Sequence, residues 1–145
     1  MHSRQYDTYL RLIRARAFID ECCDLPLDLE QIASQASFSR YHFLRLFRST
    51  FDQTPHQYLV QRRIERAKSL LAAGDLSITE VCFAVGFQSL GSFSALFHRC
   101  AGYAPKEYRA RVFRGIYLPR RFVPACFLRM LNIGVPTCRG MVHRA

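Results

Sequence analysis

Residues 78–109 read "ITEVCFAVGFQSLGSFSALFHRCAGYAPKEYR", and this stretch decides the fold because the chain contains it nearly twice. Residues 27–58, "LDLEQIASQASFSRYHFLRLFRSTFDQTPHQY", align with residues 76–108 at an offset of 49, which becomes 50 after one extra residue near Gly91. Seven aligned pairs are identical, most of them apolar or aromatic: Leu27/Leu76, Phe38/Phe87, Phe43/Phe93, Leu46/Leu96, Phe47/Phe97, Pro55/Pro105 and Tyr58/Tyr108. Two copies of a core with a spacer predict two small modules joined by a connector, since a solenoid needs three or more repeats.

Positive charge is concentrated in the second half of the chain. The formal net charge is +10; residues 1–80 hold 11 Lys/Arg against 10 Asp/Glu, and residues 81–145 hold 10 against one, which gives +1 and +9. Such asymmetry indicates a polyanionic partner, either nucleic acid or an anionic membrane surface. A solvated basic face without a partner is the alternative that charge alone leaves open.

The sequence predicts neither a signal peptide nor a membrane span. Arginines interrupt the first residues every few positions, and no run approaches the roughly 18 apolar residues that a transmembrane helix needs. We therefore expect a cytoplasmic protein with no membrane partner. The six cysteines, at positions 22, 23, 82, 100, 126 and 138, include no C-x-x-C pair, and Cys82 and Cys100 lie among apolar residues, which predicts buried, reduced thiols.

Helix signals divide each copy into short elements. An amphipathic helix is expected from Tyr6 to Cys23, and its apolar residues at helical spacing are Leu10, Ile13, Ala17 and Phe18. Asp28 with Gln31, and Ser77 with Glu80, have the spacing of capping boxes and predict a helix start in each copy.

A tight turn follows each of these short helices. Ser37 lies four positions after Ala33, and Gly86 lies four positions after Cys82. A small residue at the first position permits a close helix contact, and the second position permits a sharp turn. A second helix follows each turn. This is the helix-turn-helix arrangement, whose second helix can enter a major groove.

Helical angles divide the second helix of each copy into a buried and an exposed side. In the first copy the buried side is predicted to hold Phe43, Leu46, Phe47, Thr50 and Phe51, opposite Tyr41, Leu44, Arg45 and Arg48. In the second copy it is predicted to hold Phe93, Leu96, Phe97 and Cys100, opposite Gly91, Ser94, Ala95 and His98. The exposed sides match in position but differ in chemistry.

One long helix is expected between the copies. Thr54 is its predicted cap, Pro55 its first residue and Gly74 its stop signal. Its length of about 28 Å is close to the roughly 34 Å of one turn of B-DNA, so a rigid helix can hold two reading helices on successive major grooves. We assign no fold to the last residues, 113–145.

These features resemble the DNA-binding domain of AraC/XylS-type bacterial transcription regulators. The resemblance covers residues 6–112 and rests on the two copies and on "RIERAKSLL" at 63–71. It implies an all-α fold with two helix-turn-helix subdomains, about 28–51 and 77–101, joined by a linking helix at about 55–73. It also implies a sequence-specific DNA-binding regulator of transcription, with activation as the expected outcome.

The resemblance assigns base-contacting positions to both recognition helices. By position these are Tyr41, Leu44 and Arg45 in the first, and Leu90, Gly91, Ser92, Ser94 and Ala95 in the second. Only Arg45 is a strong reader, because arginine pairs bidentately with guanine. The other residues predicted to lie at DNA are Arg40, His42, Arg48, Ser89, His98 and Arg99. Further candidates for phosphate contacts are Arg62, Arg63, Lys106, Arg109 and the helix starts at Thr54 and Ala104.

Most family members carry an additional ligand-binding or dimerisation domain, usually N-terminal, whereas only a few residues precede the first helix here. The resemblance therefore implies a short, stand-alone member that binds duplex DNA as a monomer, with RNA polymerase as a further candidate partner.

Two other functions stay open as alternatives. The basic second half suits a non-specific nucleic-acid or membrane-surface binder. Some DNA-repair methyltransferases combine this kind of domain with a reactive cysteine, which makes Cys126 in "VPACF" the residue to check for alkyl transfer. No activating His or carboxylate is near it in sequence, and the five histidines lack metal-ligand spacing, so we expect no enzyme, no cofactor and no metal.

Overall fold

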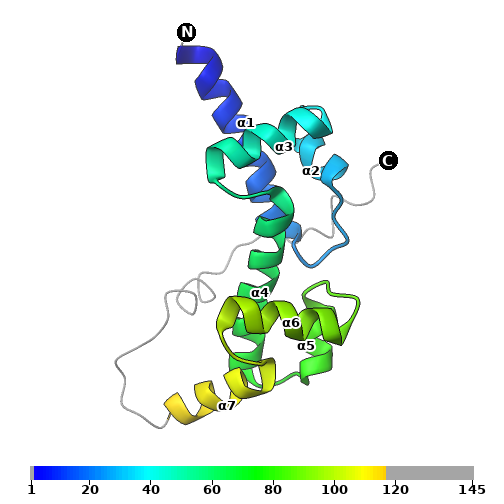
Figure 1. The fold of residues 1–145 in the computed structure, drawn as a ribbon, viewed down its shortest axis with the longest axis vertical. Helices are drawn as coiled ribbons and strands as arrows, with labels where there is room; N and C mark the ends of the chain where they lie inside the picture. The colour runs from blue at the N-terminus through cyan, green and yellow to red at the C-terminus, as the bar shows by residue number, and fades with distance from the viewer. Residues whose placement is uncertain (1, 117–145) are drawn as a thin grey trace. The chain divides into compact units, whose positions relative to one another are not determined.

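A computed structural model describes residues 2–116, which form seven helices and no strand (Figure 1). The helices are α1 (His2–Cys22), α2 (Leu29–Gln35), α3 (Arg40–Phe51), α4 (Pro55–Ala73), α5 (Ile78–Ala84), α6 (Leu90–Ala101) and α7 (Pro105–Ile116). The prediction of an all-α fold with two helix-turn-helix subdomains and a long linking helix, α4, is confirmed. None of these helices combines the length and the apolar character that crossing a bilayer requires.

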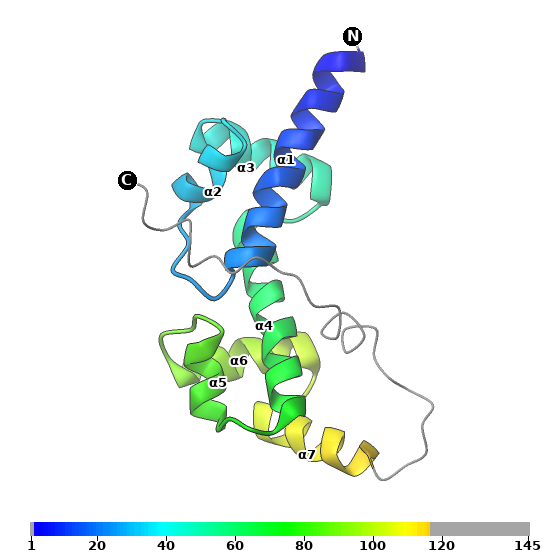
Figure 2. The same ribbon diagram turned by 180° about the vertical axis from the view of Figure 1, so that it is seen from behind.

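The chain divides into two compact units between Arg62 and Arg63, inside α4. In the first unit α1 packs against α2 and α3. In the second unit α5 and α6 lie beside the second half of α4, as both views show (Figures 1 and 2), and α7 packs against α6. Each unit therefore builds its own core around one helix-turn-helix pair.

The internal repeat extends further toward the N-terminus than the sequence alignment from Leu27 suggested. Three fully or almost fully buried residues of α1 match three of α4 at a constant offset of 52: Leu12/Ile64, Ala15/Ala67 and Ile19/Leu71. Arg11 and Arg63, at the same offset, each lie over the repeat-related phenylalanine, with Arg11 5.2 Å from the Phe38 ring centroid and Arg63 5.8 Å from that of Phe87. The repeat thus begins with α1 in the first unit and with the second half of α4 in the second unit.

The apolar residues that predicted an amphipathic α1 are not the most deeply buried residues of this helix. Leu10 is 40% exposed and Ala17 is exposed, while Ile13 and Phe18 are only half-buried. The helix has two apolar stripes at helical spacing, and the buried one is the stripe with the small Ala15 at its centre, which lets α2 and α3 approach closely. Periodicity alone could not choose between the two stripes, because both satisfy it.

Both predicted capping boxes are confirmed. The Gln31 amide donates to Asp28 Oδ1 at 2.7 Å, and the Asp28 amide donates to Gln31 Oε1 at 3.0 Å. The Glu80 amide donates to Ser77 Oγ at 3.1 Å, and the Ser77 amide donates to Glu80 Oε2 at 2.7 Å. Hydrogen bonding to the Ser77 side chain, and next to its backbone amide, lowers the pKa of the Glu80 carboxyl below its ordinary value.

The two turns use the left-handed backbone at equivalent positions, as predicted. Ser37 has φ 53° and Gly86 has φ 91°. The extra residue of the second copy lies at Gln88, because α3 is capped by Ser39 directly after its turn phenylalanine, whereas the α6 cap Ser89 comes one residue later. The insertion therefore lengthens the turn and does not distort α6 at Gly91.

Phenylalanine pairs fill the two cores. The rings of Phe43 and Phe47 are 5.4 Å apart, and those of Phe93 and Phe97 are 5.7 Å apart; all four side chains are fully buried. Thr50 and Cys100, which helical angles placed on the buried side, are exposed. Both lie in the last turn of their helix, beyond the pair of core rings. The prediction was wrong because it used only the angle of each residue around the helix and not its position along the axis.

Three of the described cysteines are buried: Cys22, Cys23 and Cys82. Burial raises the pKa of the Cys82 thiol. The prediction for Cys82 is confirmed and that for Cys100 is wrong, while Cys126 and Cys138 lie outside the described residues.

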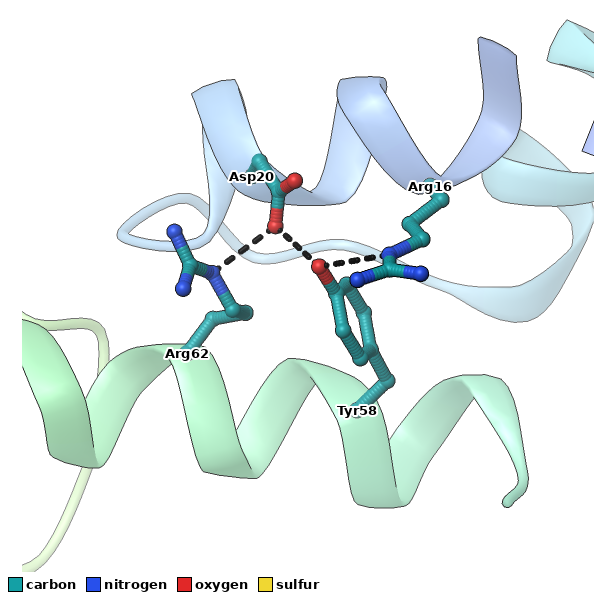
Figure 3. Close-up of polar contacts among 4 residues, drawn as sticks. All are labelled: Arg16, Asp20, Tyr58 and Arg62. Atoms are coloured by element: carbon teal, nitrogen blue, oxygen red, sulfur yellow. Dashed lines mark hydrogen bonds and ion pairs between the residues drawn. The ribbon is translucent and has the colours of Figure 1, made fainter. Parts of the chain in front are cut away.

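A polar network fastens α1 to the start of α4 in the first unit (Figure 3). Arg16 Nε donates to the Tyr58 hydroxyl at 3.0 Å, and that hydroxyl donates to Asp20 Oδ1 at 2.6 Å. Arg62 Nε approaches the same Asp20 oxygen at 2.8 Å. The Arg16 guanidinium also lies 5.2 Å from the centroid of Phe51, the last residue of α3, so the network holds the end of that helix too.

Candidate nucleic-acid interface

The outward face of α3 is fixed by its buried face. Because Phe43 and Phe47 are fully buried, residues two positions before each of them point outward: Tyr41 is 75% exposed and Arg45 is exposed. Arg48 is also exposed, whereas Leu44 is half-buried and offers part of its side chain. These are the positions that helical angles predicted.

Neighbouring side chains position the polar groups of this face. Arg40 Nη2 donates to the Tyr41 hydroxyl at 3.0 Å, and its guanidinium lies 5.0 Å from the Tyr41 ring centroid. Arg45 Nη2 lies 3.4 Å from His42 Nδ1. The His42 ring packs edge-on against Phe38, with centroids 5.2 Å apart. Arginine, tyrosine and histidine thus form a basic, hydrogen-bonding surface along α3.

The outward face of α6 has the same geometry and a different chemistry. Its exposed residues are Leu90, Gly91, Ser92, Ala95, His98 and Arg99, and Ser94 is half-buried. The Ser92 amide donates to the N-cap Ser89 Oγ at 3.2 Å, and Ser89 Oγ donates to Ser92 Oγ at 2.9 Å. The basic groups of this helix, His98 and Arg99, both lie in its last turn.

Residues 41–50 and 91–100 have the same burial class at every position. Arg45 therefore corresponds to Ala95, and Tyr41 corresponds to Gly91. The outward surfaces of the two helices match in position. Only α3 carries arginines at the outward positions of its first two turns.

Three arginines predicted to contact phosphate are engaged inside their own units. Arg62 pairs with Asp20, Arg63 covers the Phe87 ring, and Arg109 Nη2 donates to the Leu76 carbonyl. Lys106, by contrast, is exposed. The constant offset of 52 between Arg11 and Arg63 is the sequence signal that would have identified the ring-covering role.

The helix start at Thr54 is already capped by its own side chains. The Gln57 amide donates to Thr54 Oγ1 at 3.2 Å, and the Thr54 amide donates to Gln57 Oε1 at 2.8 Å. Two of its backbone N–H groups are thus used internally, which weakens the case for phosphate at this end. Between residues 2 and 116, no three His, Cys, Asp or Glu side chains gather as a metal site.

A family model for the helix-turn-helix domain matches residues 32–111, more than half of the chain. Regulatory protein SoxS of Escherichia coli (strain K12) is 32% identical over 96 residues, which span 66% of this chain and 90% of that protein. A crystal structure of a transcriptional regulator with an AraC-type DNA-binding domain, from Chromobacterium violaceum, matches with a TM-score of 0.69 and 28% identity over 77% of this chain and 96% of that one. The chain belongs to the AraC/XylS family.

A second solved structure adds a nucleic-acid complex. The DNA-binding domain of AdpA, a global transcriptional factor crystallised with a target DNA, matches with a TM-score of 0.67 and 34% identity, over 73% of this chain and 95% of that one. Some curated relatives of this AraC/XylS protein are longer: at 34% identity the chain spans 32% of the length of one of them. The chain thus carries the DNA-binding domain of AraC-type transcription regulators.

Proposed function

We propose that this AraC/XylS protein binds a specific site on double-stranded DNA through α3 and α6 and regulates transcription there, as an activator. The observation that carries the proposal is the identical burial pattern of residues 41–50 and 91–100. Two helices that bury the same positions present the same outward positions, so both modules are shaped to insert a recognition helix. The match to the DNA-bound AdpA domain supports duplex DNA as the partner.

Helix α3 is the stronger reader of the two. Arg45 is exposed at a central outward position and can donate two hydrogen bonds to the O6 and N7 atoms of guanine. Arg40 and Arg48 flank it and suit phosphate oxygens on either side of the groove. Tyr41, held by Arg40, presents its ring for a thymine methyl group or its hydroxyl for a phosphate.

Helix α6 positions the protein on the DNA and approaches the groove closely. Its basic residues, His98 and Arg99, lie in the last turn and suit the DNA backbone. Its first turns have no charged side chain, so the two half-sites of the operator are expected to differ in sequence. A single chain with two different readers suits an asymmetric site occupied by a monomer.

The linking helix suits a fixed half-site spacing. Helix α4 runs without interruption for 19 residues, about 28 Å at 1.5 Å per residue. We propose that α3 and α6 occupy successive major grooves of one duplex, that residues 6–112 form the DNA-binding domain, and that RNA polymerase is the partner in activation.

Competition binding tests the proposal against its non-specific alternative. A site is first selected from a random DNA pool, and binding is then measured while unrelated duplex DNA is added in large excess. We expect the selected site to hold the protein at least a thousandfold more tightly than the competitor, the lower range for specific regulators. Equal affinity for all duplexes would replace the proposal with non-specific, charge-driven binding.

A further inference from the structure

We propose that α6 reads the C5-methyl groups of thymines, so that the second half-site of the operator is specified by apolar contacts. This inference rests on the proposed function and names what one of its two readers recognises. Leu90 and Ala95 are the contacting side chains, and Gly91 is the residue whose missing side chain lets α6 approach the wall of the groove.

The outward surface of the first turns of α6 is uncharged and includes two apolar side chains. Leu90 is 41% exposed at the first helical position, and Ala95 is exposed at the position equivalent to Arg45. No Lys, Arg, Asp or Glu occurs from Leu90 to Phe97. Since the N-terminal residues of a recognition helix are those that reach base edges, the part of α6 that enters the groove carries carbon at two of its reading positions.

Two serines at the start of this surface, Ser89 and Ser92, are hydrogen-bonded to each other. Ser89 Oγ accepts from the Ser92 amide and donates to Ser92 Oγ, which uses the cap proton internally. Ser94 is half-buried. Hydroxyls are also permissive readers, because they both donate and accept and so tolerate several bases.

Gly91 is not required by the fold of the protein. A Cβ atom built at Gly91 meets nothing within 4 Å, and its backbone is not in the left-handed region, unlike that of Gly74 and Gly102. Glycine is a poor helix former, so a glycine here lacks a structural reason. An absent side chain beside Leu90 and Ala95 lets the helix backbone approach the groove wall.

Thymine offers the only apolar group on the major-groove edge of the four bases. Guanine, cytosine and adenine present hydrogen-bonding groups there, whereas thymine adds a methyl group that alanine and other apolar side chains contact. A surface of Leu90, Gly91 and Ala95 complements that group and offers no partner to the hydrogen-bonding groups of the other bases. The chain would then pair a guanine reader, Arg45, with a methyl reader on α6.

Removing single methyl groups from the DNA tests the proposed methyl contacts directly. In the selected operator, each thymine of the half-site bound by α6 is replaced by deoxyuridine, which removes the methyl group and retains the base-pairing edge. We expect affinity to fall about fourfold for each contacted thymine, the factor for losing burial of one methyl-sized group. Replacing the same T·A pair by C·G should lower affinity further, and 5-methylcytosine in place of that cytosine should recover part of the loss.

Protein variants assign the methyl contact to α6. In Leu90→Ala the penalty for deoxyuridine should shrink toward zero at the thymine next to Leu90. Phe83→Ala is the matched control, because Phe83 is 57% exposed in the same unit but belongs to α5, and it should leave the penalty unchanged.

Two results would overturn the inference. One is deoxyuridine having no effect at any thymine of that half-site while cytosine abolishes binding, which would mean reading by hydrogen bonds or DNA shape. The other is an unchanged deoxyuridine penalty in Leu90→Ala. Neither result would contradict the proposed function. Failure of the proposed function would instead appear as loss of binding in excess competitor DNA.

Discussion

Tyr41 and Gly91 occupy the same position in their recognition helices, the second residue of α3 and of α6. Both positions are exposed, and the buried positions that follow them match one for one. One module therefore places a tyrosine that is 75% exposed where the other places no side chain at all. The repeated fold has the same packing in both modules, while the two outward surfaces differ in chemistry.

Gly91→Ala should change folding stability and DNA affinity in opposite directions. The added Cβ meets no protein atom within 4 Å, and alanine favours the helix, so the free energy of unfolding should rise by up to about 1 kcal/mol. Affinity for the selected operator should fall, because the methyl group separates α6 from the groove. Denaturant unfolding and operator titration measure the two effects on the same sample.

Gly74→Ala is the matched control for that variant. Gly74 has φ +83°, and a Cβ there would lie 2.5 Å from Phe113 Cζ, so alanine should destabilise the fold. An operator affinity that stays unchanged in a stabilised Gly91→Ala protein would contradict close approach by α6.

Arg45→Ala should weaken binding to the operator by about 1 to 3 kcal/mol and relax the preference at one base pair. The reason is that Arg45 is the arginine at the central outward position of α3. Arg48→Ala is the comparison: a phosphate contact should weaken binding to all sequences about equally and reduce the salt dependence. If the base preferences of Arg45→Ala match those of the unmodified protein, Arg45 is not the reader.

Ala95→Glu should weaken binding to any duplex. Ala95 is exposed on the outward face of α6, so a carboxylate there would meet both the groove wall and the phosphate charge. Ala110→Glu adds the same charge at an exposed position of α7 in the same unit and should have the smaller effect. Equal losses in electrophoretic mobility-shift titrations of the two variants would argue against insertion of α6.

Tyr58→Phe should lower the free energy of unfolding by about 1 to 3 kcal/mol, because one hydroxyl joins Arg16 to Asp20 in a half-buried network. Tyr9→Phe, on a side chain that is 48% exposed, should have little effect. Thermal or urea unfolding at neutral pH measures both, and equal stability of the two variants would mean that the network contributes nothing.

The same network predicts a pH dependence at the alkaline side. Burial and, next, the hydrogen bond to Asp20 raise the pKa of Tyr58 above its ordinary value of 10.0. A raised pKa means that the protonated phenol stabilises the fold, fully below pH 10.0 and progressively less as pH rises through the folded-state pKa. The stability difference between Tyr58→Phe and the unmodified protein should therefore shrink at high pH.

Sequence reasoning worked where local chemistry determines the structure. Asp28 and Ser77 can satisfy orphan amides only at a helix start, and Gly86 tolerates a left-handed turn, so these signals located the helices. The outward residues of α3 and α6 followed, because the spacing of buried phenylalanines fixes the opposite side. Repetition of the pattern made each inference stronger than a single copy would.

The sequence did not predict features for which two arrangements fit the local pattern equally well. Helix α1 carries two apolar stripes, and only packing against α2 and α3 decides that Ala15 is buried and Leu10 is exposed. Arginine is likewise ambiguous, since the same side chain serves phosphate, carboxylate or an aromatic ring. That Arg62 meets Asp20 and Arg63 covers Phe87 depends on tertiary neighbours far away in sequence.

Hydroxyl-radical footprinting of the selected operator in excess competitor DNA tests the central claim most directly, that one chain reads one site with two different helices. The account predicts two protected segments on one face of the duplex, about one helical turn or roughly 34 Å apart, at one protein per site. It further predicts that Arg45→Ala weakens protection of one segment first and Ala95→Glu that of the other. A single protected segment, or protection that competitor DNA removes, would contradict the account.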